Sequence, residues 1–369
     1  MKALFAILMQ KELFYFNPEA GPLIINNMNK PSKKGVLIVN LGTPDSPSTP
    51  DVRKYLREFL SDKRVIDINP IGRWMLVNLI IAPFRAPKSA KVYQQLWEDR
   101  GSPLMFYGLD VQQALSEALG TTYEVALGMR YQQPSIASAL DQLMAKNVSE
   151  ILVIPLFPQY ASATTGSVAD KVMEIVKDWQ VIPTIKFVEQ FLEEPLFIQT
   201  IAEQAQPLME KTDYDHFLFS FHGIPERQIK KASCDGYCQL GKCCDTYHAK
   251  NRYCYRAQCF HTARLVAQAL QIPEEKFSVA FQSRLGKDPW IQPYADQMLK
   301  EMPAKGYKKV LAFSPSFIAD CLETTVEVGD EFKEEFLEAG GEQWDLVPSL
   351  NAHPTWVKCL EEMVHKHLD

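Results

Sequence analysis

The side chains best suited to chemistry are a histidine that ends one predicted strand and a group of carboxylates that follows another. An aromatic-rich run over residues 216–221 ends at His222, and Gly223 and Pro225 come directly after it. Ligands bind at the carboxyl ends of strands in open α/β sheets, where an imidazole can accept a proton or ligate a metal. Taken alone, His222 is equally consistent with a packed core residue.

Three carboxylates, Asp320, Glu323 and Glu327, follow a second predicted strand. On a helix they occupy positions i, i+3 and i+7, so we expect them to share one face. A solvated acidic face is the alternative interpretation, but several residues between these carboxylates are apolar. A row of carboxylates leading to a histidine suits proton removal or the passage of a divalent cation.

Six of the eight cysteines lie between residues 234 and 259, although the chain shows no clear secretory signal. A cluster of this kind is more typical of a metal site than of a disulfide framework. The spacing matches no standard zinc signature. The candidate ligands are Cys234, Cys238, Cys243, Cys244 and Cys254, with Cys259 as the sixth cysteine of the group.

Apolar segments of strand length alternate with helical segments, a pattern that predicts an α/β fold of parallel βαβ units with helices on both faces. The length of 369 residues indicates roughly two domains. A net charge of -6 argues against nucleic acid as a partner, and no apolar stretch is long enough to span a bilayer. We expect strands at 36–41, 123–129, 151–155, 217–221, 277–282 and 310–314, and helices at 51–60, 134–146 and 354–367.

The two halves of the chain share an internal repeat, which indicates a duplicated domain with a cleft between the copies. In this register His222 falls opposite Leu41, and Glu323 falls opposite Ala163. The second copy therefore holds the ionisable groups and the first presents apolar ones, which suits a flat hydrophobic substrate attacked from one side. The matched segments are 40–44 with 221–225, 125–130 with 279–284, and 155–165 with 315–325.

Two further segments, one strongly apolar and one at the N-terminus, lie outside the repeated pattern. Residues 65–84 are strongly apolar and predict either a core helix or an exposed lip around a large apolar ligand or on a membrane surface. We expect residues 1–34 to be an N-terminal extension that is disordered or not native, because no convincing strand begins before residue 35 and Met28 would be a natural start.

Five motifs occur in order along the chain, at residues 40–44, 158–160 with 164–167, 220–225, 281–284 with 289–290, and 320–327. Over about residues 35–366 this arrangement resembles the ferrochelatases, which insert ferrous iron into a porphyrin at the end of haem synthesis. The resemblance implies two similar Rossmann-like domains with parallel sheets and an active-site cleft between them. It divides the chain into a domain at 35–205, with a porphyrin lip at about 65–106, and a domain at 206–369, with an internal cysteine segment at 234–259. No G-x-G-x-x-G motif follows the first strand, so NAD is not expected.

The resemblance gives His222 and Glu323 the central roles, either in removing the pyrrole protons or as direct ligands of the Fe2+ substrate. It leaves the order of the proton and metal steps open. Asp320 and Glu327 would extend an acidic path to this pair. Six residues match positions near the porphyrin or its propionates, where Arg and Lys would pair with carboxylates: Arg85, Lys88, Tyr93, Ser102, Arg130 and Tyr131.

Leu41 lies where relatives that act on coproporphyrin tend to carry Tyr, which favours protoporphyrin IX as the substrate. Trp290 belongs to a family motif to which we assign a role in structure as well as in binding.

Two alternatives remain open for the function. One is a metal chelatase for coproporphyrin or another tetrapyrrole, and the other is a porphyrin or haem carrier without turnover.

Some ferrochelatases carry a [2Fe-2S] cluster held by four thiolates, and a subset uses an internal cysteine segment. The resemblance therefore makes such a cluster the candidate cofactor of the cysteines at 234–254, with a structural zinc as the alternative. It makes Cys259 a less favoured cluster ligand, because Cys259 resembles a cysteine in relatives that lack a cluster. It also implies a cytoplasmic lyase, with peripheral membrane contact as a further expectation, and it leaves the oligomeric state open.

Overall fold

The computed structural model describes residues 33–233, 236–284, 286 and 288–369. Two expectations lie outside the described residues, namely the N-terminal extension up to residue 32 and the ligand role of Cys234. Residues Lys33–Asp369 form one compact unit.

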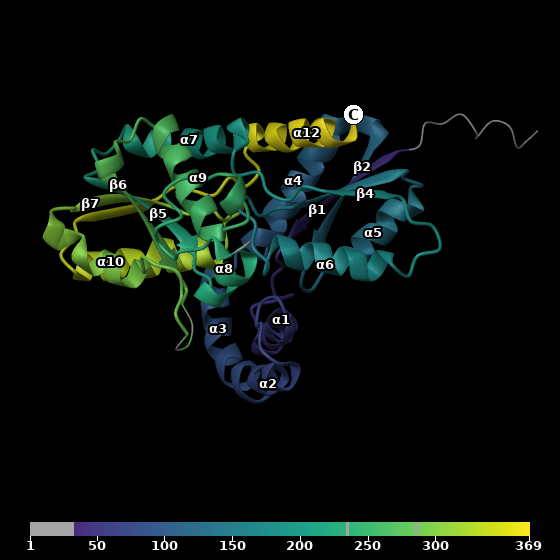
Figure 1. The fold of residues 1–369 in the computed structure, drawn as a ribbon, viewed down its shortest axis with the longest axis horizontal. Helices are drawn as coiled ribbons and strands as arrows, with labels where there is room; N and C mark the ends of the chain where they lie inside the picture. The colour runs from purple at the N-terminus through teal and green to yellow at the C-terminus, as the bar shows by residue number, and fades with distance from the viewer. Residues whose placement is uncertain (1–32, 234–235, 285, 287) are drawn as a thin grey trace, which may run out of the picture. The chain divides into compact units, whose positions relative to one another are not determined.

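Two four-stranded parallel sheets form the framework, which confirms the predicted α/β class (Figure 1). The strand orders, β2-β1-β3-β4 and β6-β5-β7-β8, repeat the same topology. The edge strands β4 and β8 are absent from the sequence prediction because each has only four residues. The strands are β1 Lys34–Asn40, β2 Tyr123–Met129, β3 Glu150–Pro155, β4 Thr184–Phe187, β5 His216–His222, β6 Phe277–Gln282, β7 Lys309–Phe313 and β8 Gln343–Leu346.

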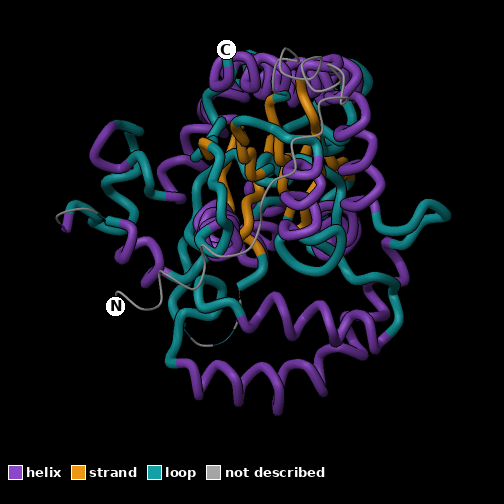
Figure 2. The backbone as a smooth tube through the Cα atoms, turned by 90° about the vertical axis from the view of Figure 1, so that its right-hand side faces the viewer, coloured by secondary structure: helices purple, strands orange, loops and turns teal. Residues whose placement is uncertain are grey.

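Helices cover both faces of each sheet (Figures 1 and 2). The α-helices are α1 Thr49–Ser61, α2 Pro70–Met75, α3 Ala82–Leu96, α4 Pro103–Leu119, α5 Ile136–Ala145, α6 Thr165–Val176, α7 Pro195–Met209, α8 Glu226–Ala232, α9 Tyr255–Ala269, α10 Ala295–Glu301, α11 Phe332–Glu338 and α12 Pro354–Leu368. Two segments are π-helices, η2 Leu76–Ile81 and η8 Leu322–Glu331. Short 3-10 turns occur at η3 Gly120–Thr122, η5 Ala249–Asn251, η6 Glu274–Lys276 and η7 Pro303–Lys305.

The strand side chains alternate between two cores, as the period of two along a strand requires. Val36 and Ile38 belong to a core that runs under α4, α7, α9 and α12 and also includes residues of β5. Leu37 and Val39 face the opposite way, into a core with α5 and α6. A third core packs the second sheet against α10 and α11. The first of these cores joins the two sheets, so both halves contribute to one apolar layer.

The backbone register refines the predicted repeat. Met129 N donates to Pro134 O at 2.6 Å at the end of β2, and Phe281 N donates to Pro293 O at 2.8 Å at the end of β6. Met129 therefore corresponds to Phe281, and Arg130 corresponds to Gln282. The predicted match of 125–130 with 279–284 is wrong by two residues, because the Val-Ala pair on which it rests stands two positions later in β6 than in β2. The match of Leu41 with His222 holds, since Asn40 pairs with Met129 and Phe221 pairs with Phe281.

His216, at the start of β5, should make the fold sensitive to acid. The ring is 1% exposed, stacks on Tyr307 and lies 2.8 Å from the Ser278 hydroxyl through Nε2. Burial, together with the charge of Lys305, lowers the pKa of His216 from 6.5 to about 4. Because the unfolded chain binds this proton more tightly, the free energy of unfolding should fall by about 3 kcal/mol as the pH drops from about 6.5 to about 4.

Urea unfolding at several pH values checks this prediction with the variant His216→Gln. The variant cannot titrate at this position, so its stability should decline less steeply over the same pH window than that of the wild type. His367→Gln, in the last turn of α12, is the control and should keep the wild-type slope. Equal slopes for wild type and His216→Gln would show that other groups carry the acid sensitivity.

Candidate active site

A cavity of about 920 Å³ lies where the carboxyl ends of the two sheets face α1, η2 and α3. Its lining is mostly apolar, and both halves of the chain contribute. Leu41 follows β1 on one side, and His222 ends β5 on the other. Parallel sheets place ligand sites at this end of their strands, and the volume is within the range of sites for small molecules and cofactors.

His222 and Glu323 meet in the wall of this cavity. The negative charge of Glu323 acts on the imidazole and raises its pKa, but burial has the larger effect and lowers the pKa of His222 below 6.5. The ring is therefore neutral at pH 7 and can accept a proton or a metal ion. The next residue, Gly223, donates from its backbone N to Gln282 O at 2.9 Å, and a Cβ at this position would lie 2.8 Å from the same oxygen. This close approach explains why glycine follows the histidine.

The segment that carries the carboxylates is a π-helix rather than the expected α-helix, and it starts at Leu322. Asp320 therefore precedes the helix, and the predicted row of Asp320, Glu323 and Glu327 is wrong for its first member. The Asp320 carboxylate instead accepts hydrogen bonds from Ser349 N at 3.0 Å and Asn351 Nδ2 at 2.7 Å, outside the cavity lining. π-Helices are rare and often mark functional sites.

The acidic row continues to Glu331 rather than back to Asp320. A π-helix has more residues per turn than an α-helix, so carboxylates four residues apart lie nearly in line. Glu323 acts electrostatically on Glu327, and Glu331 does the same from the far side. The sequence analysis ended the row at Glu327, although Glu331 follows four residues later, a spacing at which side chains share a helix face.

Glu327 is held by side chains from the end of β6. Ser283 Oγ donates to the Glu327 carboxylate, at 2.8 Å from Oε1 and 2.6 Å from Oε2, and Gln282 Nε2 donates to Oε2 at 2.9 Å. Burial raises the pKa of Glu327 to about 7, although both hydrogen bonds oppose the shift. At neutral pH this carboxyl group is therefore divided between its protonated and ionised forms, as a proton relay requires.

Two tyrosines from the first half and one cysteine also surround Glu323. Tyr93, on α3, and Tyr55, on α1, line the cavity with their rings edge to face, and their centroids lie 6.3 Å apart. Burial and the nearby charge of Glu323 raise the pKa of both phenols, so both stay protonated. Burial likewise raises the pKa of the Cys321 thiol. Tyr55 was missed by the sequence analysis because nothing in a helical heptad distinguishes it from a core residue.

The predicted substrate-binding residues divide into two groups. Leu41, Arg85, Tyr93 and Trp290 line the cavity together with Arg227 and Arg284 of the second half. Lys88, Ser102, Arg130 and Tyr131 do not belong to its lining.

Arg130 and Tyr131 support the wall from behind. Arg130 forms a buried ion pair with Asp62 at 2.7 Å, and Tyr131 OH donates to the same carboxylate at 2.9 Å. Ser102 Oγ accepts from Thr43 Oγ1 at 2.9 Å. These groups are already paired within the protein, so we expect them to hold the cavity in shape rather than to touch a ligand.

The comparisons with known proteins agree with this geometry. A family model described as Ferrochelatase matches residues 33–368. The chain belongs to the ferrochelatase family. A ferrochelatase of Legionella pneumophila (strain Corby) is 45% identical over 336 residues, which cover 91% of this chain and 100% of the relative. A ferrochelatase of Coxiella burnetii (strain Dugway 5J108-111) is 44% identical over 347 residues, or 94% of this chain and 96% of the relative.

A solved structure supports the fold alone. The sirohydrochlorin chelatase SirB from Bacillus subtilis subspecies spizizenii, in complex with cobalt, aligns with a TM-score of 0.50 at 10% identity and covers 90% of this chain and 94% of its own. The ferrochelatase-family chain therefore has the chelatase fold.

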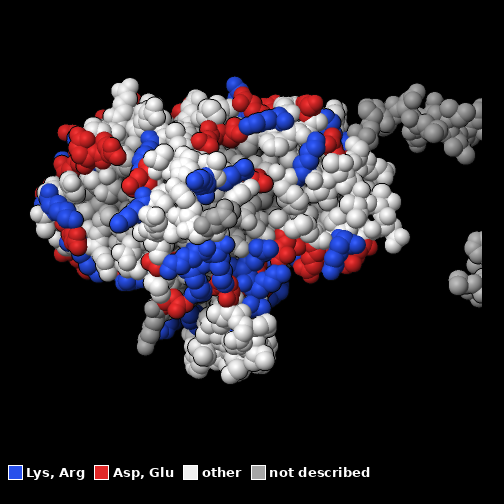
Figure 3. Space-filling view, in the orientation of Figure 1, with Lys and Arg blue, Asp and Glu red and all other residues white. Residues whose placement is uncertain are grey.

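Within the lip predicted at about 65–106, α2, η2 and α3 stand apart from the sheets, together with the preceding helix α1 (Figures 1 and 2). Its end is apolar and exposed, and Lys and Arg side chains gather over α8 directly above it (Figure 3). Among the described residues, no helix is long and apolar enough to cross a membrane. More than half of the surface of five large side chains is exposed, namely Ile71, Trp74, Leu79, Ile80 and Phe84.

The cysteine segment lies between α8 and α9. Cys244 is buried, and its hydrogen bond with Cys254 lowers the pKa of the Cys244 thiol and raises that of Cys254. Cys238 and Cys243 lie close enough to act on these thiols electrostatically. Within the described residues, no group of three or more His, Cys, Asp or Glu side chains has the arrangement of a metal site.

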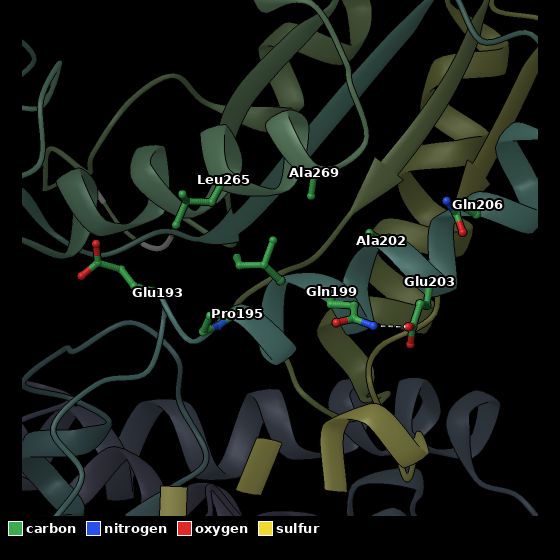
Figure 4. Close-up of a pocket in the computed structure, with 9 residues that line it drawn as sticks. Glu193, Pro195, Gln199, Ala202, Glu203, Gln206, Leu265 and Ala269 are labelled. Atoms are coloured by element: carbon green, nitrogen blue, oxygen red, sulfur yellow. Dashed lines mark hydrogen bonds between the residues drawn. The ribbon is translucent and has the colours of Figure 1, made fainter. Parts of the chain in front are cut away.

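A second pocket, of about 550 Å³, lies between α7 and α9 (Figure 4). Its floor includes Leu265 and Ala269, and its polar residues are mostly from α7. Gln199 Nε2 donates to Glu203 Oε1 at 2.6 Å, and Glu203 also accepts from Thr355. Because these polar groups already bond to one another, the pocket presents no set of groups for catalysis.

Proposed function

We propose that this chain inserts Fe2+ into protoporphyrin IX to form protohaem. The observation that carries the proposal is the pairing of a neutral His222 with Glu323 in the wall of a large apolar cavity. A planar porphyrin needs apolar walls on both faces and a proton acceptor at its centre. The first half provides apolar lining and the second half provides the acceptor. Membership of the ferrochelatase family supports the same reaction.

Metal insertion exchanges two pyrrole N–H protons for one Fe2+, so the site has to remove two protons. His222 takes the two pyrrole protons in turn, and each time the negative charge of Glu323 stabilises the imidazolium until its proton is passed on. Glu327, with a pKa of about 7, accepts the proton next and passes it along the acidic row toward Glu331. The two nitrogens left without protons then bind the metal ion.

The substrate assignment rests on the first half of the cavity. Leu41 places an aliphatic side chain opposite His222, where it packs against the porphyrin face and offers no hydrogen bond to an extra carboxylate. Arg85 lines the same cavity and can pair with one propionate, and Arg284 can pair with the other by exchanging its exposed partner Asp296, 2.9 Å away. These features favour protoporphyrin IX over coproporphyrin, which carries four propionates.

Steady-state metallation under anaerobic conditions tests the function. The purified chain is given Fe2+ with either protoporphyrin IX or coproporphyrin, and the porphyrin absorption bands are followed. We expect turnover with protoporphyrin IX at a higher kcat/KM than with coproporphyrin. The opposite preference would assign the chain to coproporphyrin, and tight porphyrin binding without turnover would identify a carrier.

We also propose that the cysteine segment binds a [2Fe-2S] cluster. The support is chemical: Cys238, Cys243, Cys244 and Cys254 provide four soft donors close together, and the thiolate form that ligates iron is favoured at Cys244. Cys234, outside the described residues, is a fifth candidate. When bound, the cluster would crosslink the segment between α8 and α9.

Metal analysis of anaerobically purified protein tests the cluster. We expect about two iron atoms and two acid-labile sulfides per chain, both lost in Cys254→Ser. Cys359→Ser, at a buried thiol of α12, is the control and should keep both. Zinc without sulfide would support the structural zinc instead, and a protein with neither metal would exclude both assignments.

Finally, we propose that the apolar end of the lip rests on a membrane surface, from which a hydrophobic porphyrin can enter. Exposed apolar side chains beside Lys and Arg are typical of interfacial segments, and anionic lipids attract the basic groups. The double variant Trp74→Ser/Phe84→Ser removes two side chains that are 59% and 71% exposed. We expect its binding to vesicles of phosphatidylcholine and phosphatidylglycerol to weaken by about 10-fold or more.

Vesicle cosedimentation measures this effect. The control, Val181→Ser/Ile182→Ser, removes two exposed apolar side chains from the loop before β4, away from the lip, and should bind vesicles as the wild type does. Equal binding by all three proteins would count against the membrane contact and would leave the lip as a substrate entrance only.

A further inference from the structure

The strand that ends at His222 contains another buried polar side chain, Ser220, two residues earlier. Ser220 is 0% exposed, although the neighbouring strand residues Phe219 and Phe221 are apolar. In the first half of the chain, the register places Val39 at the corresponding position. A buried hydroxyl is unfavourable unless it is hydrogen-bonded. Because this hydroxyl occurs only in the half that contains His222 and Glu323, we expect its hydrogen-bond partner in that half.

That partner is Gln282, at the end of β6. Ser220 Oγ donates to Gln282 Oε1 at 2.6 Å. Gln282 Nε2 donates in turn to two acceptors on η8, the Glu323 backbone oxygen at 3.0 Å and the Glu327 carboxylate at 2.9 Å. The residue is 2% exposed, and both N–H groups and one lone pair of its amide are used inside the protein.

Gln282 also holds the histidine side of the site. It pairs with His222 in the parallel register of β5 and β6, and its backbone oxygen accepts from Gly223 N at 2.9 Å. One residue therefore connects the strand of the proton acceptor with the helix of the two carboxylates.

The first half of the chain has a corresponding hydrogen bond between strand and helix, but without an ionisable carboxylate on the helix. Arg130, which corresponds to Gln282, donates from Nε to Ser167 Oγ at 2.6 Å, and Ser167 lies on the helix that follows β3. Glu327 lies on the helix that follows β7. In both halves, the residue at the carboxyl end of the second strand therefore bonds a side chain of the helix that follows the third strand. In the second half that side chain is an ionisable carboxylate.

We infer that Ser220 is a positioning residue for iron insertion, which acts through Gln282 to fix Glu323 and Glu327 relative to His222. The inference rests on the function proposed above. Without the Ser220 hydroxyl, Gln282 Oε1 would be buried without a donor. The amide would then turn toward another partner and release the backbone of Glu323 and the carboxylate of Glu327.

Kinetics of Ser220→Ala with Fe2+ and protoporphyrin IX test this role. We expect kcat to fall by roughly 3- to 10-fold while the KM for porphyrin stays within twofold, because the cavity walls are unchanged. Thr200→Val is the matched control, since it removes another fully buried hydroxyl, bonded to Leu196 O at 2.6 Å on α7. The control should keep the wild-type kcat.

A double-mutant cycle separates positioning from a general loss of stability. In a Gln282→Ala background, Ser220→Ala should cause no further loss of kcat, because the path from Ser220 is already broken. If Ser220→Ala does not fold, Ser220→Cys retains the size and a weaker donor, and the same cycle is run with it. The inference would be overturned if the losses of kcat in the two single variants added up in the double variant, or if the Ser220 variant had the kcat of Thr200→Val. In either case, turnover by the wild type would still support the proposed function. Absence of wild-type turnover would instead reject the proposed function.

Discussion

Replacing His222 by alanine should lower kcat for iron insertion by roughly 10²- to 10⁴-fold, the usual contribution of a positioned acid or base. His222 is the only imidazole in the lining of the main cavity among the described residues, and burial keeps it neutral at pH 7. Glu327, the other proton acceptor beside Glu323, is bound by Ser283 and Gln282, so we expect it to accept the proton from His222 rather than from the porphyrin. The KM for porphyrin should change little, because most of the lining is apolar and remains intact.

Absorption spectroscopy under anaerobic conditions measures the rate, and fluorescence quenching measures porphyrin binding separately. His367→Ala, on the last turn of α12, is the control and should metallate porphyrin at the wild-type rate. If His222→Ala retained more than about a tenth of the wild-type rate, the proton acceptor would have to be another residue.

Changing Glu323 to glutamine should lower kcat by roughly 10²-fold or more, although the side chain keeps its shape. The carboxylate raises the pKa of His222, which means that it favours the imidazolium formed when a proton is accepted. Glutamine removes that charge, so the proton transfer becomes less favourable. The loss should appear in kcat for protoporphyrin IX, with porphyrin affinity nearly unchanged.

The matched control is Glu274→Gln, which neutralises an exposed carboxylate on η6 and should have wild-type activity. A rate for Glu323→Gln within twofold of that control would exclude Glu323 from the reaction. A large increase in the KM for Fe2+ with kcat preserved would instead favour a role for Glu323 as a ligand of the incoming metal.

The sequence predicted those features that depend on residues close together in the chain. Apolar runs of five residues or more predicted the inner strands, and the helix predicted at 51–60 is α1, where the Ser48 hydroxyl accepts from Asp51 N. The strand ending at His222 was also predictable, because Gly223 and Pro225 follow it. The four-residue edge strands β4 and β8 were not, since so few residues establish no period.

The errors arose where tertiary contacts decide the outcome. The helix η8 begins only at Leu322, which leaves Asp320 outside it, and no local pattern distinguishes a π-helix from an α-helix. Arg130 has the residue type of a propionate ligand, but Asp62 from another segment pairs with it. The chain of bonds from Ser220 to Glu327 joins residues more than a hundred positions apart, so only the fold reveals it.

The most direct test of the central claim measures proton release and porphyrin metallation together. Protoporphyrin IX and Fe2+ are mixed anaerobically with the protein in weak buffer, and a pH indicator is followed beside the porphyrin absorption bands. The account predicts two protons released per porphyrin metallated by the wild type, with both signals lost in His222→Ala and Glu323→Gln. Porphyrin binding by the wild type without either signal, or wild-type signals in both variants, would contradict it.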